Sequence, residues 1–305
     1  MNEAQKRAAV ARVAAWFHSY DFGDGVSVSG HKPLEKLRRE WALLKLPDLA
    51  GKAVLDINTW DGWFALQAER HGAGRVVALD SYMWSMDLAE HTRYCQEVKA
   101  AGGIPRPYHE MPYFRPDELP GKIGFDTARS ILGSSVEDMV GDFATMNLDP
   151  LRARFDVVLY LGTLYHMADP IGNLRRLYEV TTPGGLAVIE TQAMTIDGLE
   201  HVPLCENYGP LHPLNTDSSN WWSPNALALR QMLLAVGFES AEITVGPPPP
   251  VESAPQPEQR GLWPARSRER AASTPPPPQV RPYRAYAHAR RSAAESTSVN
   301  PIPFM

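Results

Sequence analysis

Short apolar runs that end in a polar residue or a glycine recur along the chain, and amphipathic stretches separate them. Apolar runs of roughly four to eight residues are typical of strands buried on both faces of a parallel sheet, whereas apolar positions three or four apart predict helices. The predicted strands are 54–57, 76–79, 136–140, 155–162, 186–190, 241–245 and 281–290. The predicted helices between them are 63–70, 126–132, 170–181 and 224–236. This alternation predicts an α/β fold with a doubly wound, mostly parallel, seven-stranded sheet whose last strand runs antiparallel to 241–245.

Two segments stand outside this alternation on its N-terminal side. Residues 1–50 predict a helical extension, with helices at 4–17 and 33–46 around a glycine-rich loop. Residues 81–124 form an insertion after the second strand, in which a helix-competent stretch leads into an aromatic, proline-bearing segment. Long insertions of this kind are usually functional lids or disordered. The aromatic residues Tyr108, Tyr113 and Phe114 favour a lid.

The last part of the chain changes character after the domain at 51–245. Residues 246–280 contain two runs of four prolines and too few apolar residues to pack a core, which predicts a flexible loop. Residues 281–290 then predict the final strand, and 291–305 a tail. The alternative is a disordered segment from 246 to the end.

Composition limits the classes of function. The 305 residues are 44% hydrophobic and carry a net charge of −5, so a sizeable core is expected and no global basic field attracts nucleic acid. Cys95 and Cys205 are too far apart to suggest a metal cluster, and a reducing cytoplasm fits them. We see no apolar run long enough for a membrane span. The chain is therefore expected to be cytoplasmic, with neither a membrane partner nor a bound metal.

The stretch from Val54 to Phe64 carries the strongest chemical signal. A strand ends at Asp56, a tight turn reaches Gly62, and the next strand ends at Asp80. An acid at the tip of the second strand can accept hydrogen bonds from both ribose hydroxyls of a nucleoside. A dinucleotide-binding turn needs three glycines to face a pyrophosphate, and only Gly62 stands here in a glycine position. The turn therefore favours S-adenosylmethionine, which has an amino-acid head and a ribose but no phosphate, over NAD.

Three stretches give the chain a specific resemblance. They are Gly51–Gly62, the run Phe155–His166 with Asp169-Pro170 after it, and Gly184–Thr191 with Trp222–Asn225 and Gly237-Phe238 downstream. In these, the chain resembles the class I S-adenosylmethionine-dependent methyltransferases, and among them the branch of the tRNA uridine-34 carboxymethyltransferases and their small-molecule relatives. The resemblance spans about residues 12–245 and implies a Rossmann-like sheet. The Leu-Tyr-His…Asp-Pro stretch, paired with Ile-Glu-Thr, is its most specific part.

The resemblance also implies roles for individual residues. The cofactor-binding residues it implies are Asp56, Asn58, Trp60 and Gly62 at the methionine end, Asp80 at the ribose, Asp142 and Phe143 at the adenine, and Leu161 beside them. Asn58 stands where the family usually has glycine, and asparagine is the non-glycine residue that best tolerates left-handed backbone. Asp80 has an alternative as a helix N-cap and Asp142 as a solvated turn acid.

The catalytic candidates follow two neighbouring strands at the carboxyl edge of the sheet, where ligands bind in such folds. His166 is the acid/base candidate, Tyr165 would hold the acceptor or the methyl region, and Glu190 is a second base or an acceptor-orienting acid. Capping a helix, filling the core and pairing with an arginine are the respective structural alternatives. Residues predicted to bind the acceptor are Tyr108, Tyr113, His201, Trp222 and Arg284, with Trp222 favoured as a packing anchor. His212 and Trp221 lie in the same connection as His201 and Trp222, which the resemblance implies shapes the acceptor pocket.

The sequence thus predicts an S-adenosylmethionine-dependent methyltransferase for a small-molecule acceptor, such as a sugar or secondary metabolite. The long insertion and the acidic net charge favour a small molecule over tRNA. Carboxymethyl transfer to uridine 34 of tRNA from carboxy-S-adenosylmethionine is the alternative, and Arg284 matches an arginine that the tRNA enzymes carry at the chain end. A cofactor-binding paralogue without catalysis is the alternative of another class. The acceptor atom and the oligomeric state stay open.

Overall fold

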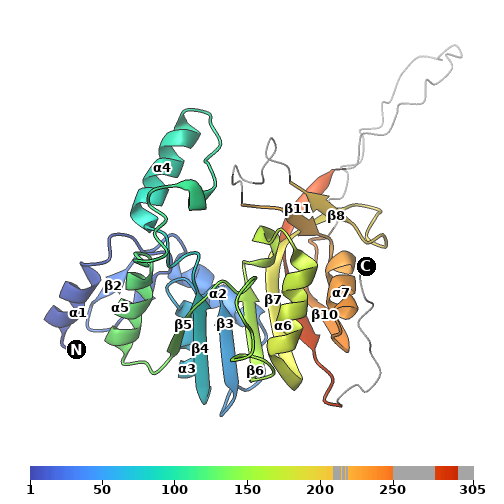
Figure 1. The fold of residues 1–305 in the computed structure, drawn as a ribbon, viewed down its shortest axis with the longest axis horizontal. Helices are drawn as coiled ribbons and strands as arrows, with labels where there is room; N and C mark the ends of the chain where they lie inside the picture. Colours follow the sequence, from blue (N-terminus) through green and yellow to red (C-terminus); the bar gives the residue numbers. More distant parts are fainter. Residues whose placement is uncertain (209–213, 215–216, 218, 250–278, 295–305) are drawn as a thin grey trace, which may run out of the picture.

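The computed structural model describes residues 1–208, 214, 217, 219–249 and 279–294. Its main feature is a seven-stranded sheet with the strand order β10-β11-β7-β6-β3-β4-β5 (Figure 1). The strands are β3 (Ala53–Ile57), β4 (Arg75–Asp80), β5 (Glu137–Val140), β6 (Phe155–Leu161), β7 (Thr181–Ile196), β10 (Ser240–Val245) and β11 (Val280–Arg290). Strands β3 to β7 pair in parallel, and β11 is antiparallel to both of its neighbours. The predicted fold class is confirmed.

Helices cover both faces of this sheet. Its side chains alternate between two buried clusters, as successive residues of a strand must. One cluster takes in α2 (Leu34–Leu43), α3 (Trp63–Arg70) and α5 (Lys122–Leu132), and the other takes in α6 (Pro170–Val180) and α7 (Ala226–Ala235). Among the described residues, no helix combines the length and the apolar character that crossing a membrane requires. All strands of the parallel part end at one edge, with a core on each side below it.

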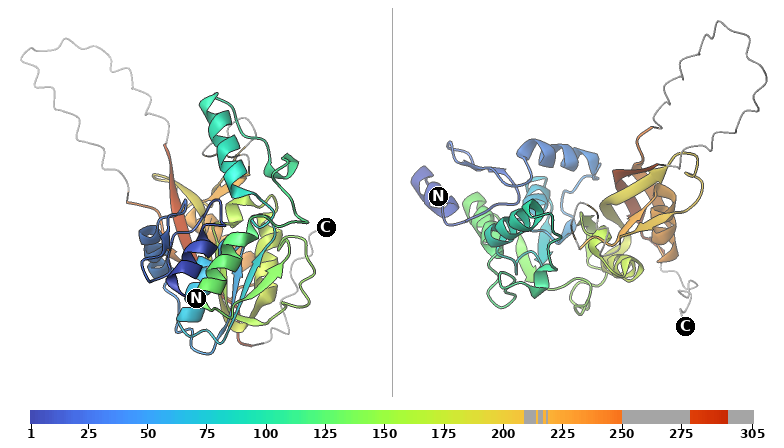
Figure 2. Two further views of the ribbon diagram at one scale, coloured as in Figure 1. Left: turned by 90° about the vertical axis from the view of Figure 1, so that its left-hand side faces the viewer. Right: turned by 90° about the horizontal axis from the view of Figure 1, so that it is seen from above.

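The insertion after β4 stands above that edge. It contains α4 (Leu88–Ala100) and the short helix η1 (Tyr108–Glu110), and α4 extends beyond the strand ends (Figure 2, left). Across from it, the connection from β7 to α7 forms a small antiparallel sheet of β8 (Cys205–Asn207) and β9 (Trp222–Pro224). The two parts flank the carboxyl edge of the sheet (Figure 1).

Two predicted elements differ in length from the observed ones. Helix α1 (Glu3–Val10) is shorter than predicted, because the chain leaves the helical conformation after Val10. The Lys32 amide then donates to the Phe17 carbonyl, and this bond connects the two sides of the loop that leads to α2. The extension also holds β1 (Tyr20–Asp21) and β2 (Ser27–Val28). Strand β7 is much longer than predicted because β11 pairs with it from Ile196 to Leu186. Most of the predicted proline-rich loop at 246–280, and most of the tail, lie outside the described residues.

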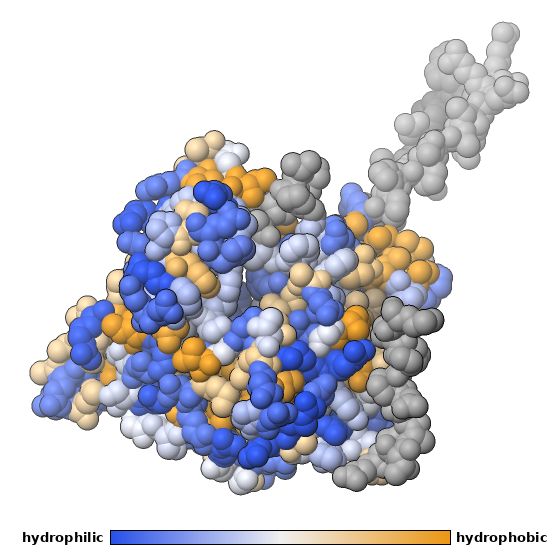
Figure 3. All heavy atoms as spheres, in the orientation of Figure 1, coloured by the Kyte–Doolittle hydropathy of each residue, from blue (hydrophilic) through white to orange (hydrophobic). Residues whose placement is uncertain are grey.

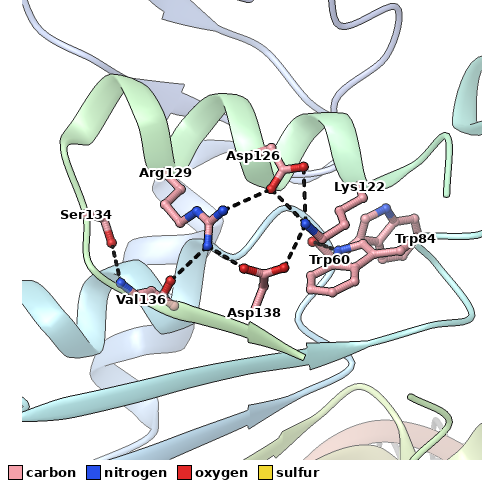
Figure 4. A network of polar contacts seen from close by, with 8 residues as sticks. All are labelled: Trp60, Trp84, Lys122, Asp126, Arg129, Ser134, Val136 and Asp138. Carbon is pink, nitrogen blue, oxygen red and sulfur yellow. Dashed lines mark hydrogen bonds and ion pairs between the residues drawn. The ribbon is translucent and has the colours of Figure 1, made fainter. Parts of the chain in front are cut away.

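A polar network supports the turn after β3 from the side of α5. Lys122 Nζ bridges Asp126 at 2.9 Å and Asp138 at 2.8 Å, which ties α5 to β5 (Figure 4). The ring of Trp84 lies beneath the same ammonium, 5.2 Å from ring centroid to Nζ, and its indole N–H donates to Trp60 O at 2.7 Å. The turn is thus held by its own backbone and by a buried indole from the start of the insertion.

Candidate active site

A cavity of about 1580 Å³ lies at the carboxyl edge of the sheet, between the insertion and the β8–β9 connection. The surface is hollowed between these two parts in Figure 3. The cavity brings together residues from the turn after β3, from the end of β6, from the middle of β7 and β11, and from both flanking parts. The predicted site residues that line it are Asp56, Asn58, Trp60, Tyr108, Asp142, Phe143, Leu161, Tyr165, His166, Glu190 and Arg284.

The turn after β3 adopts the backbone that its sequence predicted. Asn58 has φ of 59° and Trp60 of 54°, so two non-glycine residues are left-handed here. Asn58 thus has the left-handed backbone that asparagine tolerates best among the non-glycine residues. Asp56 is buried and points into the turn, where its Oδ2 accepts from Thr59 Oγ1 at 2.6 Å and from the Ala65 amide at 3.1 Å. Asp56 therefore holds the turn in place through hydrogen bonds to Thr59 and Ala65, and its contact with a cofactor stays a prediction.

The turn after β5 forms another part of the cavity wall. Phe143 is buried, whereas Asp142 is largely solvated and caps its own turn through the Ala144 amide and the Thr145 hydroxyl, both at 2.9 Å. The alternative of a solvated turn acid thus describes Asp142 in this structure. Its contact with an adenine stays a prediction.

An ion pair joins β7 and β11 inside the cavity, and it lies within both strands because β7 continues beyond Glu190 to Ile196. Arg284 donates from two guanidinium nitrogens to both Glu190 oxygens, with Nη2 to Oε2 at 2.5 Å, and lies 4.7 Å from the centroid of the Tyr165 ring. Burial alone would lower the pKa of Arg284, but the Glu190 carboxylate and Tyr165 raise it above its usual value. The pairing with arginine foreseen as an alternative for Glu190 is what the structure contains.

His166 lies on the short helix η2 (Leu164–His166) that follows β6. Its Nδ1 is 2.8 Å from Ser219 Oγ and 3.3 Å from Ser219 O, and its ring lies 4.0 Å from the Tyr165 ring between centroids. Burial lowers the pKa of His166, and Asp217 opposes this only in part. The imidazole is therefore neutral at neutral pH and suited to accept a proton.

Comparison with known proteins places the chain in a family. The profile of a family described as "Methyltransferase domain" matches residues 31–243. The chain belongs to this methyltransferase family. The resemblance to class I S-adenosylmethionine-dependent methyltransferases that the sequence predicted is thereby confirmed.

Individual relatives are more distant. The chain is 26% identical over 194 residues to the tRNA U34 carboxymethyltransferase of Ectopseudomonas mendocina (strain ymp). The aligned region covers 63% of this chain and 46% of that protein. It is 27% identical over 223 residues to the same enzyme of Pseudoalteromonas translucida (strain TAC 125), covering 71% and 55%. The chain thus spans about half the length of the curated relatives it matches. Among solved structures, the N-terminal domain of EvdMO1 with SAH and D-fucose shares the fold, with a TM-score of 0.53, 15% identity, and coverage of 95% and 98%.

Five predicted site residues lie away from the cavity of this methyltransferase domain. Gly62 (φ 81°) packs against Phe125, whose ring would lie only 2.5 Å from a Cβ added at this position, so this glycine serves the packing of α3. Asp80 is fully buried and accepts from the Trp60 amide at 2.9 Å and the Met83 amide at 3.0 Å. The predicted ribose contact of Asp80 stays a prediction, because the carboxylate is buried and does not line the cavity in this structure.

The other three belong to the two flanking parts. Tyr113 is buried, with its hydroxyl 3.2 Å from His91 Nδ1. Trp222 donates its indole N–H to Ala168 O at 3.3 Å, in agreement with a packing anchor. His201 is exposed and does not line the cavity. His212 lies outside the described residues.

Sequence reasoning missed several residues of the cavity wall. His18 and Lys32 reach it from the N-terminal extension, and Asp217 and Ser219 from the β8–β9 connection. The side chain of His18 is 3% exposed, and its Nδ1 has no hydrogen-bond partner among the described residues. No motif marks these positions, because their segments carry neither helical nor strand periodicity. The return of the chain in the bridge between Phe17 and Lys32, and the amides of Phe17 and His18 bound to Asp61, bring the extension over the turn.

Three buried carboxyls around the turn predict an unusual pH dependence of stability. Burial raises the pKa of Asp61 from 3.8 to about 7, although its Oδ2 accepts from the Phe17 amide at 2.7 Å and the His18 amide at 2.8 Å. Burial also raises the pKa of Asp56 to about 7 and of Asp80 to about 6. A carboxyl with a raised folded-state pKa stabilises fully below its unfolded pKa and loses that contribution as pH rises through the folded pKa. Their contribution to the free energy of unfolding therefore falls between about pH 4 and pH 7.

We expect Asp61→Asn to reduce this fall, because the amide oxygen still accepts both backbone N–H groups and the side chain cannot ionise. Urea denaturation from pH 4 to pH 8 measures the slope. Asp138→Asn is the control of opposite sign, since Lys122 and Arg129 together lower the pKa of Asp138 against the effect of burial. It should cost stability at pH 7 and little at pH 4. A slope that Asp61→Asn leaves unchanged would contradict the expectation.

Proposed function

We propose that the protein is an S-adenosylmethionine-dependent methyltransferase that methylates a hydroxyl or amine of a small-molecule acceptor in the cytoplasm. The observation that carries the proposal is the continuous cavity of about 1580 Å³, which runs from the turn after β3 to His166 and Arg284. Pockets for one small ligand hold roughly 300–1000 Å³, so this cavity has room for a cofactor and an acceptor together. The insertion with Tyr108 lies over it and limits the size of the acceptor. Residues 81–124 are accordingly proposed as a lid.

The residues at the turn fit the amino-acid head of S-adenosylmethionine. The buried imidazole of His18 has an unpartnered Nδ1 at the cavity wall within the described chain, and Lys32 lies close by, with its Nζ 5.4 Å from the centroid of the Phe64 ring. These two groups suit a carboxylate, although Lys32 also pairs with Glu40 at 2.5 Å. The left-handed backbone at Asn58 and Trp60 makes the tight turn, and the Asn58 side chain narrows the site beside it. Phe143 and Leu161 offer an apolar wall for the adenine. The turn lacks the three glycines that a pyrophosphate needs, which again disfavours a dinucleotide.

The mechanism needs alignment and one proton acceptor. The cofactor supplies an activated methyl group, and the protein holds the acceptor in line with it, which accounts for much of the rate enhancement in such transfers. His166 takes the proton of the acceptor hydroxyl or ammonium through Nε2, because its Nδ1 side faces Ser219. Glu190 is the poorer base, since both its oxygens bind Arg284. Tyr165 lies between His166 and Arg284 and positions the reacting group.

Carboxymethyl transfer to tRNA is the second candidate function. The similarity to the tRNA U34 carboxymethyltransferases favours it, as does Arg284 at the cavity wall. A cofactor carboxylate at Arg284 would have to displace Glu190 or lie beside it. The net charge of −5 also gives little attraction for a polynucleotide.

Calorimetric titration with S-adenosylmethionine, its carboxylated analogue and NAD tests the cofactor. We expect S-adenosylmethionine to bind, the carboxylated form to bind more weakly, and NAD not to bind. In Glu190→Gln, the preference against the carboxylated form should fall by about 10- to 100-fold, because a hydrogen bond to a charged group contributes about 1.5–3 kcal/mol.

Each other outcome rejects a specific part of the proposal. Tighter binding of the carboxylated form by the unmodified protein would favour the tRNA reaction, and binding of none of the three would remove the enzyme assignment. Binding of S-adenosylmethionine without transfer to any acceptor of a hydroxyl and amine panel would favour a cofactor-binding protein without catalysis.

A further inference from the structure

We infer that Asp217 and Ser219 are positioning residues that fix His166 in the tautomer with the proton on Nδ1, and that Tyr108 of the insertion completes their network. The inference rests on the proposed role of His166 as the base. It adds residues and a proton location to that role.

Four polar groups from three separate parts of the chain meet beside the cavity. Ser219 donates from Oγ to Asp217 Oδ1 at 2.7 Å and from its amide to the same oxygen at 2.9 Å. The hydroxyl of Tyr108 lies 3.0 Å from Asp217 Oδ1 and 3.0 Å from Ser219 Oγ. His166 Nδ1 lies 2.8 Å from that same Oγ. The Asp217 carboxylate thus gathers three donors, and one serine hydroxyl links it to the imidazole.

The hydrogen count of this network places the proton on His166. A serine hydroxyl has one hydrogen, and the charged carboxylate of Asp217 is its stronger acceptor. Ser219 Oγ therefore accepts from His166, which requires a hydrogen on Nδ1. The Ser219 carbonyl, 3.3 Å from Nδ1, can only accept and so agrees with this assignment, but its contact is longer and weaker than that of Oγ.

The Nδ1–H tautomer leaves the lone pair of a neutral imidazole on Nε2. Within the described chain, the hydrogen bonds of the His166 ring all involve Nδ1. The ring is also held by Tyr165, whose carbonyl accepts from the Trp221 amide at 2.8 Å and so fastens η2 to the β8–β9 connection. Orientation and tautomer are thus set from one side of the ring, and Nε2 is left for the acceptor.

Tyr108 links this arrangement to the insertion. Its ring packs against His91 of α4, with centroids 4.7 Å apart, and against Tyr82, with centroids 5.5 Å apart. Its hydroxyl reaches across to Asp217, 109 residues later in the chain. The contact exists only where the insertion lies against the β8–β9 connection. Closure over the acceptor therefore adds a donor to Asp217, and the base is best ordered when the cavity is covered.

Nitrogen NMR of the full-length protein with ¹⁵N-labelled histidine tests the tautomer without any acceptor. His166→Asn assigns the ring resonances by their loss. We expect the Nδ1 shift of a protonated nitrogen and the Nε2 shift of an unprotonated one. Asp217→Asn and Ser219→Ala should shift both resonances towards those of a tautomer mixture, Ser219→Thr should restore them, and Tyr108→Phe should shift them in part.

Tyr208→Phe is the matched control. It removes another tyrosine hydroxyl of the same connection, one that bonds a carboxylate (Glu206, 3.0 Å) and a serine (Ser223, 2.6 Å) but does not line the cavity. It should leave His166 unchanged. A proton on Nε2 in the unmodified protein, or shifts that neither Asp217→Asn nor Ser219→Ala changes, would overturn the inference. An effect of Tyr208→Phe as large as that of Tyr108→Phe would overturn the link to the insertion. S-adenosylmethionine binding, measured on the same samples, reports separately on the proposed function.

Discussion

The His166→Asn variant is expected to lose methyl transfer while it still binds S-adenosylmethionine. Asparagine can place an amide N–H near the position of Nδ1 and keep the hydrogen bond to Ser219, but it offers no basic nitrogen to the acceptor. General base catalysis contributes roughly 10²- to 10⁴-fold in rate, so kcat should fall by about that factor. Because the turn proposed to bind the cofactor is untouched, the dissociation constant of S-adenosylmethionine should change little. Transfer of a labelled methyl group to an acceptor found by screening measures the first, and calorimetry the second.

The matched control is His71→Asn, at an exposed histidine that ends helix α3 outside the cavity. It should leave kcat unchanged. For the unmodified protein, the rate should rise with pH through a pKa below the usual 6.5 of histidine, since burial lowers the pKa of His166. A His166→Asn enzyme with full kcat would remove His166 from the mechanism and return attention to Glu190.

Local pattern was enough to predict the sheet. The strands β3, β4 and β6 are apolar runs that alternate with helices, and this alternation predicts a doubly wound parallel sheet. The order of the strands, in which β6 lies beside β3, comes from the structure. The left-handed backbone at Asn58 was likewise predictable, because few residue types tolerate it. The length of β7 was not, since its extension depends on pairing with β11, whose residues follow a long segment without strand pattern.

The polar contacts of the site depend on tertiary structure that no local pattern encodes. Glu190 and Arg284 are 94 residues apart, and only the antiparallel register of β7 and β11 makes them partners. Asp217 and Ser219 lie in a connection without periodicity and become candidates only through their distances to His166 and Tyr108. Asp80 was placed at the correct edge of the sheet. The direction of its side chain could not be predicted, because it depends on the buried amides of Trp60 and Met83, which the carboxylate binds in the folded structure.

Trp84 connects the stability of the fold to the geometry of the turn after β3. Its side chain is fully buried, and its ring packs on Phe125 with centroids 5.2 Å apart. The indole N–H binds the carbonyl of Trp60, whose φ of 54° is costly for a side-chain-bearing residue. The ring of Trp60 is in turn stacked on Phe17, with centroids 3.4 Å apart. One buried indole therefore holds a strained residue of the cavity wall from below.

We expect Trp84→Ala to lower the free energy of unfolding by about 3–5 kcal/mol, the usual cost of removing a buried Trp side chain. The cavity it leaves and the freed Trp60 carbonyl should also weaken S-adenosylmethionine binding in the molecules that remain folded. Trp84→Phe separates the two effects, because it keeps most of the apolar volume and removes only the indole donor, a loss of about 1 kcal/mol. Trp221→Ala, at a tryptophan that is 43% exposed, is the control for stability and should change it far less. Urea denaturation measures the stability of these variants, and calorimetry measures their binding of the cofactor. If Trp84→Phe binds the cofactor as tightly as the unmodified protein, the Trp60 carbonyl does not need the indole donor. The left-handed turn would then be maintained by its backbone hydrogen bonds and by the stacking of Trp60 on Phe17.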